Sequence, residues 1–273
     1  MSRLGLEIMT VFGMPPVEYV HLAADVGCGH IALALGPTPW NPCSFAAWSL
    51  TTDAALRRET KAALAERGII IAHAEGFGVR PQIDIASRAH EMDLCAELGA
   101  QRINTVSMEP DFARSVDQIA LLAEMAAARG MLATLEFAPP HPVGTLDQAV
   151  AMIAAVGAVN LRLTMDAMHF HRAGGTAAQL AALDPAMIGY IQLCDAPMVA
   201  PHDDYMREAC FERRVPGQGD LPLSDFLAAL PDDVLIGLEV PMLSAVEAGE
   251  SIGAIVRRVA DAGHRMLLES SVA

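Results

Sequence analysis

Eight short apolar segments recur along the chain, and a longer amphipathic stretch follows each of them. The segments are LGLEIM (4–9), HIALAL (30–35), IIIAHA (69–74), RINTVS (102–107), LATLEF (132–137), LRLTMD (161–166), IGYIQL (188–193) and VLIGLEV (234–240). Each is short enough for a strand and apolar enough to be buried on both faces, as parallel strands are. This pattern constrains the fold more than any other feature of the sequence.

The stretches between these segments have the spacing of amphipathic helices. Residues 52–67 begin with Thr52 and Asp53 and end before Gly68. The stretches that start at 115 and 145 begin with Ser-Val-Asp-Gln and Thr-Leu-Asp-Gln, patterns typical of a capping box at a helix start. Ala- and Leu-rich sequences with helical spacing predict further helices over residues 15–27, 83–98 and 246–262.

A strand followed by a helix, repeated eight times, predicts one (β/α)8 barrel, or TIM barrel, domain over residues 1–273. An open doubly wound sheet is the main alternative. It would normally bring a Gly-rich phosphate loop, and the sequence contains neither GxGxxG nor GxxxxGKS/T. Long connections over 36–51 and 195–221 follow strands two and seven, at the barrel end where active sites are built.

Charge and cysteine content narrow the class of protein. The net charge is −15, and such an acidic surface repels phosphate backbones, so we expect no nucleic-acid partner. The five cysteines include no CxxC pair, which is typical of a reduced protein. The N-terminal stretch is a poor signal peptide, and no apolar run approaches the roughly 18 residues of a membrane helix. We therefore expect a cytoplasmic protein without a membrane partner.

Four polar residues lie at the ends of consecutive predicted strands: Glu136, Asp166, Gln192 and Glu239. One strand-end glutamate is usually an exposed rim residue, but a buried carboxylate is costly unless it is paired or bound to a metal. Four oxygen ligands at one end of a barrel resolve that cost together. The set predicts one divalent ion, Mn²⁺, Mg²⁺ or Co²⁺, with Zn²⁺ as a further candidate.

Histidines and an aspartate near these strand ends are further candidates. His169 follows Asp166 by three residues and is expected to bind substrate hydroxyls or act as an acid or base. His73 ends strand three, with Glu75 after it, and both are expected to line the far side of the pocket. Asp195 is an alternative ligand to Gln192, or a residue that orients a neighbour.

Arginines and tryptophans in the connections complete the candidate set. Arg172 follows the predicted strand-six ligand, and Arg213 and Arg214 precede a Pro-Gly-Gln-Gly turn. Guanidinium groups suit carboxylate or phosphate recognition, so we expect Arg172 and Arg214 to bind substrate, with one of the two adjacent arginines solvated. Trp40 and Trp48 form either an apolar wall of the pocket or a dimer contact.

Together these motifs resemble the xylose-isomerase-like barrel superfamily, which includes sugar-phosphate isomerases and epimerases. The resemblance covers essentially the whole chain, and its most specific parts are DAMH (166–169), QLCDAP (192–197), PGQGDLP (216–222) and LEVP (238–241). Many sugar epimerases of the superfamily have a histidine where Gln192 stands. The Gln192 motifs are similar to those of metal-dependent 3-dehydroshikimate dehydratases. The resemblance also implies a homo-oligomer, dimeric or tetrameric.

The resemblance implies two enzymatic hypotheses. The first is isomerisation or epimerisation of a polyhydroxy carbonyl compound through a metal-stabilised enediolate, with Glu136 and Glu239 transferring the proton. The second is dehydration of a 3-dehydroshikimate- or inosose-type substrate, in which a β-hydroxyl leaves with acid help from His169. A non-catalytic binding module is the third alternative, and replaceable strand-end residues without metal binding would indicate it.

Overall fold

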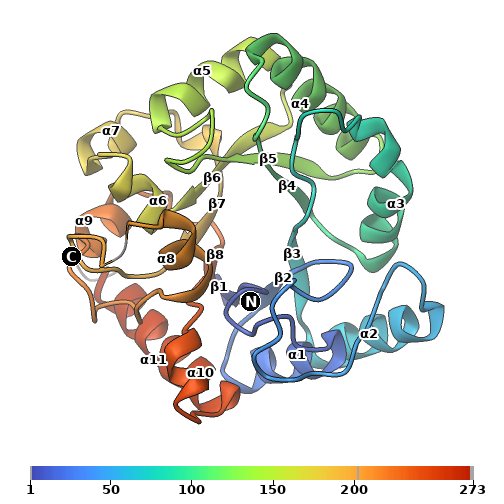
Figure 1. The fold of residues 1–273 in the computed structure, drawn as a ribbon, viewed down its shortest axis with the longest axis vertical. Coiled ribbons are helices and arrows are strands. Elements are labelled where there is room, and N and C mark those ends of the chain that lie inside the picture. Colours follow the sequence, from blue (N-terminus) through green and yellow to red (C-terminus); the bar gives the residue numbers. More distant parts are fainter. Residues whose placement is uncertain (1, 202, 271–273) are drawn as a thin grey trace.

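The computed structural model describes residues 2–201 and 203–270, which form a closed parallel barrel of eight strands in sequence order. The strands are β1 (Leu4–Leu6), β2 (His30–Leu33), β3 (Ile70–Ala74), β4 (Arg102–Val106), β5 (Leu132–Glu136), β6 (Leu161–Asp166), β7 (Ile188–Leu193) and β8 (Ile236–Leu238). Because β1 pairs with both β2 and β8, the sheet has no free edge (Figure 1). The predicted (β/α)8 barrel is confirmed, and the open doubly wound sheet is wrong.

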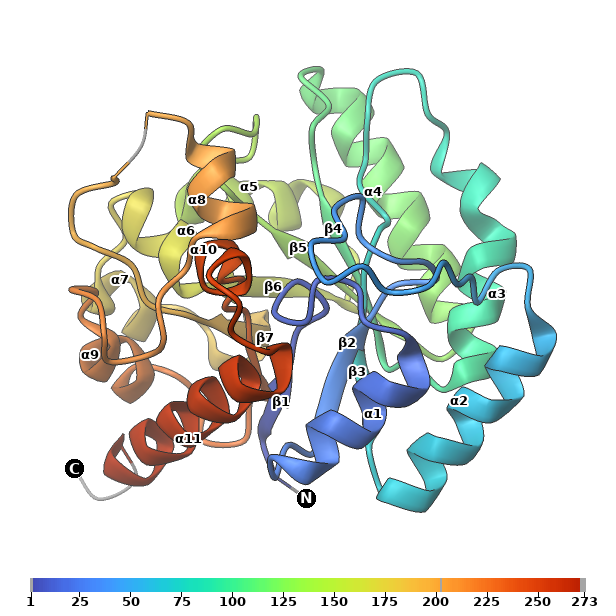
Figure 2. The ribbon, with the colours of Figure 1, turned by 60° about the horizontal axis from the view of Figure 1, so that its bottom comes forward.

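Helices surround the barrel on all sides (Figures 1 and 2). The α-helices are α1 (Pro16–Asp25), α2 (Ala54–Arg67), α3 (Ala89–Leu98), α4 (Phe112–Ala127), α5 (Leu146–Val156), α6 (Ala167–Arg172), α7 (Ala177–Ala181), α8 (Tyr205–Phe211), α9 (Leu223–Ala228), α10 (Leu243–Glu247) and α11 (Ile252–Ser270). Two 3₁₀ helices are η1 (Ile85–Arg88) and η2 (Pro185–Met187). Within the described residues, no helix has the length and apolar character needed to cross a bilayer.

Two helix starts follow from local chemistry that the sequence displays. The Asp53 carboxylate accepts hydrogen bonds from the first backbone N–H groups of α2, and that helix ends at Gly68 in the left-handed region with φ 64°. The Thr145 hydroxyl accepts from the backbone N–H of Gln148 at the start of α5. Side-chain oxygens satisfy N–H groups that have no partner within the helix, and this fixes where each helix begins.

Three predicted helices differ from the structure, and the first is the helix expected over 83–98, which is the 3₁₀ helix η1 followed by α3. The helix expected from 115 begins at Phe112, because Asp111 caps it, while the buried Ser115 hydroxyl bonds that of Ser107 at 2.6 Å. The single helix expected over 246–262 is broken into α10 and α11, with Gly249 at φ 91° between them. Glycine adopts that backbone conformation without steric cost, so the chain can turn there.

The carboxyl ends of the strands open towards one face of the barrel, where the long connections gather. Figure 2 shows α8, in the connection after β7, rising over the same end of the barrel as the segment between β3 and α3. In the connection after β2, Trp48 donates to the Gly13 carbonyl oxygen at 2.9 Å. Trp40 packs edge-on against Phe211 of α8, with ring centroids 4.7 Å apart. These connections form the walls above the strand ends.

Candidate metal centre and active site

The structure brings the four predicted ligands to the same end of the barrel. Glu136 and Asp166 are the last residues of β5 and β6, and Gln192 of β7 is the register partner of Asp166. Glu239 directly follows β8. Because these strands are neighbours in one parallel sheet, equivalent positions at their ends converge on the mouth of the barrel. All four side chains are buried or nearly so.

A buried guanidinium group lies among these carboxylates. Arg213 Nη1 donates to both oxygens of Asp166, at 3.2 and 3.0 Å, and Nη2 lies 3.8 Å from Glu239 Oε2. Arg213 Nε donates to the Ala209 carbonyl oxygen of α8, which fixes the direction of the side chain. Burial alone would raise the pKa of Asp166, but the interactions with Arg213 and His169 together outweigh burial and hold that pKa below its usual value.

Glu136 and Glu239 have too little positive charge beside them to offset the cost of their burial. Burial, with the nearby charges of Glu75 and Asp166, raises the pKa of Glu136 to about 8. Burial likewise raises the pKa of Glu239 well above its usual range, although Arg213 opposes this. A divalent cation would stabilise both ionised carboxylates, because its charge offsets the cost of their desolvation.

Gln192 provides the second sign that these residues suit a metal ion. Its Oε1 atom is buried and has no hydrogen-bond partner, and its Nε2 atom lies 3.4 Å from Glu239 Oε1. A buried acceptor without a donor is costly, and a cation ligated by this oxygen would remove the cost. The oxygens of Glu136, Asp166 and Glu239 do not all lie within 4.8 Å of one another. These residues can hold one divalent cation if the carboxylates draw together.

His169 joins the site through α6, whose first turn places it over Asp166. Its backbone N–H donates to Asp166 Oδ1 at 2.7 Å, which is the N-terminal cap of that helix. Burial lowers the pKa of His169 to about 4, so the ring is neutral at neutral pH. Burial also raises the pKa of Tyr205, whose hydroxyl lies 2.6 Å from His169 Nδ1. Tyr205 therefore donates to Nδ1, and Nε2, which then carries the ring proton, lies 3.5 Å from Glu136 Oε1.

Arg172 and Arg214, the two arginines predicted to bind substrate, do not form ion pairs with the candidate metal ligands in the described structure. Arg172 donates to both oxygens of Glu208, at 3.1 and 2.7 Å, and also to the carbonyl oxygens of Pro197 and Met198. These bonds brace the connection after β7. Arg214 is exposed, and among the described residues its guanidinium has one hydrogen-bond partner, the Gln218 carbonyl oxygen at 3.4 Å. Arg213, and not Arg214, is therefore the arginine that faces the carboxylates at the barrel mouth.

The Asp195 carboxylate binds backbone groups of the connection after β7 and so has a structural role there. Its carboxylate accepts hydrogen bonds from four backbone N–H groups, those of Ala196, Gly217, Gly219 and Leu221. Asp195 also exchanges two backbone hydrogen bonds with Arg214, at 2.8 and 2.9 Å. This short antiparallel pairing turns the Arg214 side chain to solvent and the neighbouring Arg213 to the barrel.

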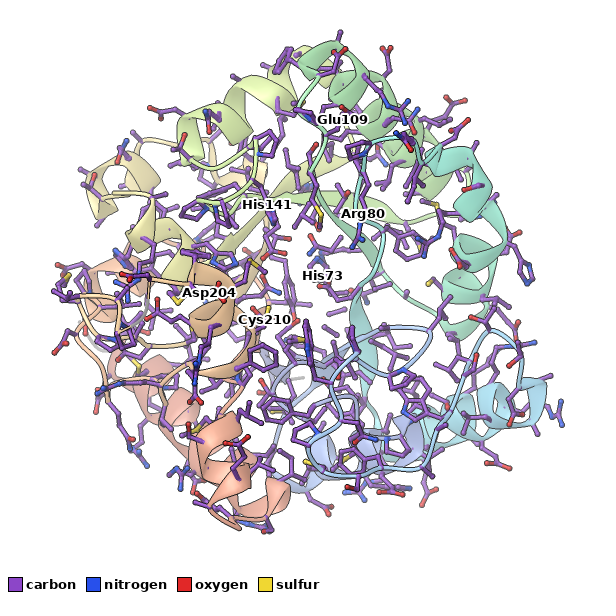
Figure 3. All side chains as sticks on the ribbon, in the orientation of Figure 1. His73, Arg80, Glu109, His141, Asp204 and Cys210 are labelled. Atoms are coloured by element: carbon purple, nitrogen blue, oxygen red, sulfur yellow. The ribbon has the colours of Figure 1, made fainter. Side chains whose placement is uncertain are left out.

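Further polar residues lie at and below the mouth. Figure 3 shows His73 near the centre of the barrel, with Arg80 and His141 from the connections after β3 and β5 at the rim. His73 is fully buried and stacks on Tyr190, with ring centroids 4.2 Å apart. The sequence interpretation missed Tyr205 as a site residue. Nothing in its local sequence marks it, because its position depends on the long connection that carries it.

The fold and this site agree with the match to known families. Residues 20–261 match the model of the family described as xylose isomerase-like TIM barrel, so the chain belongs to that family.

The chain aligns with only part of the length of each curated relative. The chain is 32% identical over 146 residues to a 3-dehydroshikimate dehydratase of Pseudomonas aeruginosa, across 50% of this chain and 22% of that protein. It is 29% identical over 152 residues to an inosose isomerase of Bacillus subtilis, across 52% of this chain and 53% of that protein. The crystal structure of the IolI protein with a bound zinc atom superposes with a TM-score of 0.80 at 18% identity, over 97% of this chain and 98% of that one. The matches thus span from about a fifth to about half of the length of these curated relatives.

Proposed function

We propose that this protein is a divalent-metal-dependent isomerase or epimerase that moves a proton beside the carbonyl group of a small polyhydroxy substrate. The observation that supports it best is the joint placement of Glu136, Asp166, Gln192 and Glu239, with the unpartnered Gln192 Oε1 among them. A metal ion bound there would polarise a carbonyl oxygen and acidify the adjacent C–H bond. The ion is Mn²⁺, Mg²⁺ or Co²⁺, with Zn²⁺ as the remaining candidate.

In this proposal, different residues of the chain transfer the proton, bind the substrate and orient its hydroxyl groups. Glu136 on β5 and Glu239 after β8 are separated by two strands of the barrel, so they face the substrate from different directions. One carboxylate accepts the proton and the other returns it. Arg213 binds a substrate oxygen and neutralises negative charge next to Asp166. His169, through Nε2–H, and the rim residues orient the hydroxyl groups.

A dehydratase is the second candidate, because one specific observation favours it. Elimination of a β-hydroxyl needs a proton donor at the leaving oxygen. The Tyr205 hydroxyl and His169 form such a pair, 2.6 Å apart, beside Glu136. The matched relative from Pseudomonas aeruginosa is named as a dehydratase. Both reactions begin with removal of the same kind of proton, so they share the carboxylates.

Incubation with substrates in D₂O separates the two reactions. The metal-free protein would be supplied with Mn²⁺, Mg²⁺, Co²⁺ or Zn²⁺ and tested against ketoses, inososes and 3-dehydroshikimate by ¹H NMR. An isomerase or epimerase gives an isomer of the substrate that carries deuterium in place of hydrogen at the reacting carbon. A dehydratase gives a product that has lost water. A compound that binds but exchanges no C–H proton with any of the metals would contradict both.

A further inference from the structure

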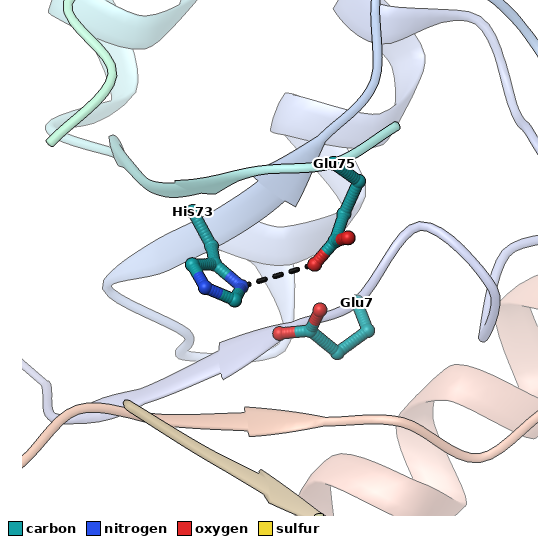
Figure 4. Close-up of side chains that lie close together, drawn as sticks. All are labelled: Glu7, His73 and Glu75. Carbon is teal, nitrogen blue, oxygen red and sulfur yellow. Dashed lines mark ion pairs between the residues drawn. The ribbon is translucent and has the colours of Figure 1, made fainter. Parts of the chain in front are cut away.

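A second polar cluster lies inside the barrel and consists of Glu7, His73 and Glu75 (Figure 4). Glu7 directly follows β1, His73 lies in β3 and Glu75 directly follows β3. One ligand atom from each lies within 4.8 Å of the other two. Among residues 2–201 and 203–270, no other three histidine, cysteine or acidic side chains meet this condition.

The hydrogen bonds of Asn104 fix the orientation of its amide. Asn104 Nδ2 lies 2.7 Å from Glu136 Oε2, and 3.3 and 3.2 Å from the two oxygens of Glu75. Carboxylates accept hydrogen bonds, so the amide nitrogen must face them and the amide oxygen must point the other way. Asn104 Oδ1 then accepts from the hydroxyls of Thr134 and Thr164, at 3.0 and 3.1 Å.

This network determines which nitrogen of His73 carries the ring proton. Each threonine hydroxyl has one proton, and Asn104 Oδ1 receives both of them. Thr134 and Thr164 therefore act as acceptors towards His73 Nε2, at 2.7 and 3.3 Å, and Nε2 is the protonated nitrogen. His73 Nδ1 is left with a lone pair.

A carboxylate oxygen lies close to that nitrogen. His73 Nδ1 is buried without a hydrogen-bond partner and lies 3.0 Å from Glu75 Oε1. Figure 4 marks this ion-pair contact with a dashed line. Two acceptors at this distance repel each other unless a cation lies next to both. In the described parts of the chain, neither Glu7 nor Glu75 forms an ion pair with arginine or lysine, in contrast to Asp166.

We propose that Glu7, His73 and Glu75 form a second divalent-cation site, with His73 Nδ1 and one oxygen of each glutamate as ligands. This proposal does not rest on the proposed function. One imidazole and two carboxylates suit a first-row cation such as Mn²⁺, Fe²⁺ or Zn²⁺. Ligands at about 2.0–2.2 Å from one ion are at most about 4.4 Å apart, so small rotations of the glutamates complete the site.

The second site borders the first through two amides. Asn104 joins Glu75 to Glu136, and Gln192 Nε2 lies 3.4 Å from both Glu7 Oε2 and Glu239 Oε1. The Tyr190 hydroxyl donates to the other Glu7 oxygen at 2.6 Å and holds that carboxylate in place. Glu75 is 22% exposed, which leaves an entry for the ion from the mouth. A cation bound there would also stabilise Glu136 through Asn104.

Equilibrium dialysis of the metal-free full chain against Mn²⁺, followed by metal analysis, tests the second site. We expect two bound ions per chain, one after Glu75→Gln or Glu7→Gln, and one after Glu239→Gln. Glu109→Gln is the matched control, because Glu109 is a buried carboxylate paired with Arg114 outside the cluster, and should keep both ions. Circular dichroism verifies that each variant folds.

The outcomes separate the two sites. A single ion that Glu239→Gln removes and Glu75→Gln leaves in place would overturn the second site while sparing the proposed function. An ion lost only in Glu75→Gln and Glu7→Gln would support the second site and contradict the first. As an independent readout, ¹⁵N NMR with Zn²⁺ should show His73 Nδ1 metal-bound. A proton on Nδ1 in the presence of Zn²⁺ would overturn the proposal, since a proton would then be the cation beside Glu75.

Discussion

The two sides of the barrel mouth balance buried negative charge in different ways. On the side of β5 to β8, the guanidinium of Arg213 lies against Asp166 and near Glu239. On the side of β1 and β3, the hydrogen bonds and ion pairs that Glu7 and Glu75 form with described residues come from tyrosine, amide and imidazole groups. The comparison shows that a resident arginine keeps one acidic cluster partly neutral, whereas the other depends on protons or on an ion from solution.

The largest expected effect comes from removing a proton-transferring carboxylate. We expect Glu136→Gln and Glu239→Gln each to lower kcat by about 10³-fold or more, because both ligation and proton transfer are lost. The measurement is turnover of the substrate identified in D₂O, at saturating Mn²⁺. Glu109→Gln should retain the wild-type rate, and equal losses in all three variants would indicate damage to the barrel rather than to a site.

Arg213→Met should give the largest change in stability. It leaves Asp166 buried without its partner, at a cost of about 3–5 kcal/mol in the free energy of unfolding of the metal-free protein. Urea denaturation measures this, and added Mn²⁺ should recover part of the loss. Arg214→Met, at the exposed neighbouring position, should change stability by no more than about 0.5 kcal/mol. Similar losses in the two variants would refute the distinction between them.

Asp195→Ala should release the segment that holds Arg213 in place. The variant removes the acceptor for four backbone N–H groups, and we expect a loss of about 2–4 kcal/mol. Hydrogen exchange should increase at Gly217 and Gly219 and stay unchanged in β1 to β3. Faster exchange spread evenly over the barrel would contradict a local role.

The smallest effect concerns pH and His30, which lies beside the second cluster, 3.4 Å from the Tyr190 hydroxyl. Burial lowers the folded-state pKa of His30 to about 4, below its unfolded value of about 6.5. The unfolded chain therefore binds a proton first, and stability is lost as the pH falls from about 6.5 to 4, by at most about 1.4 kcal/mol per pH unit. His30→Gln should flatten this part of the stability profile. An unchanged profile would show that other groups cause the loss.

Much of the barrel and of the set of four candidate metal ligands could be predicted from the sequence, for a physical reason. Parallel strands are buried on both faces, so a carboxylate at the end of an apolar run stands out, and the closed barrel places such ends together. Glu136, Asp166, Gln192 and Glu239 could be grouped in this way. Glu7 also interrupts an apolar run, and that signal could have identified it.

The irregular connections could not be predicted in the same way. Whether Arg213 or Arg214 faces the barrel depends on the antiparallel pairing of Asp195 with Arg214, which joins residues 19 positions apart without a periodic pattern. Tyr205 reaches His169 because Asp204 caps α8 and aims the helix at the mouth. Such contacts depend on tertiary geometry, so sequence spacing carries little information about them.

An anomalous difference map from crystals grown with Mn²⁺ tests the central claim most directly. We expect a peak about 2.0–2.4 Å from oxygens of Glu136, Asp166, Gln192 and Glu239, with the carboxylates drawn together and Arg213 moved from between Asp166 and Glu239. The Glu239→Gln variant, crystallised in the same way, should lose this peak. No peak among the four residues, with Arg213 still bonded to Asp166 and Gln192 Oε1 still unpartnered, would contradict the account.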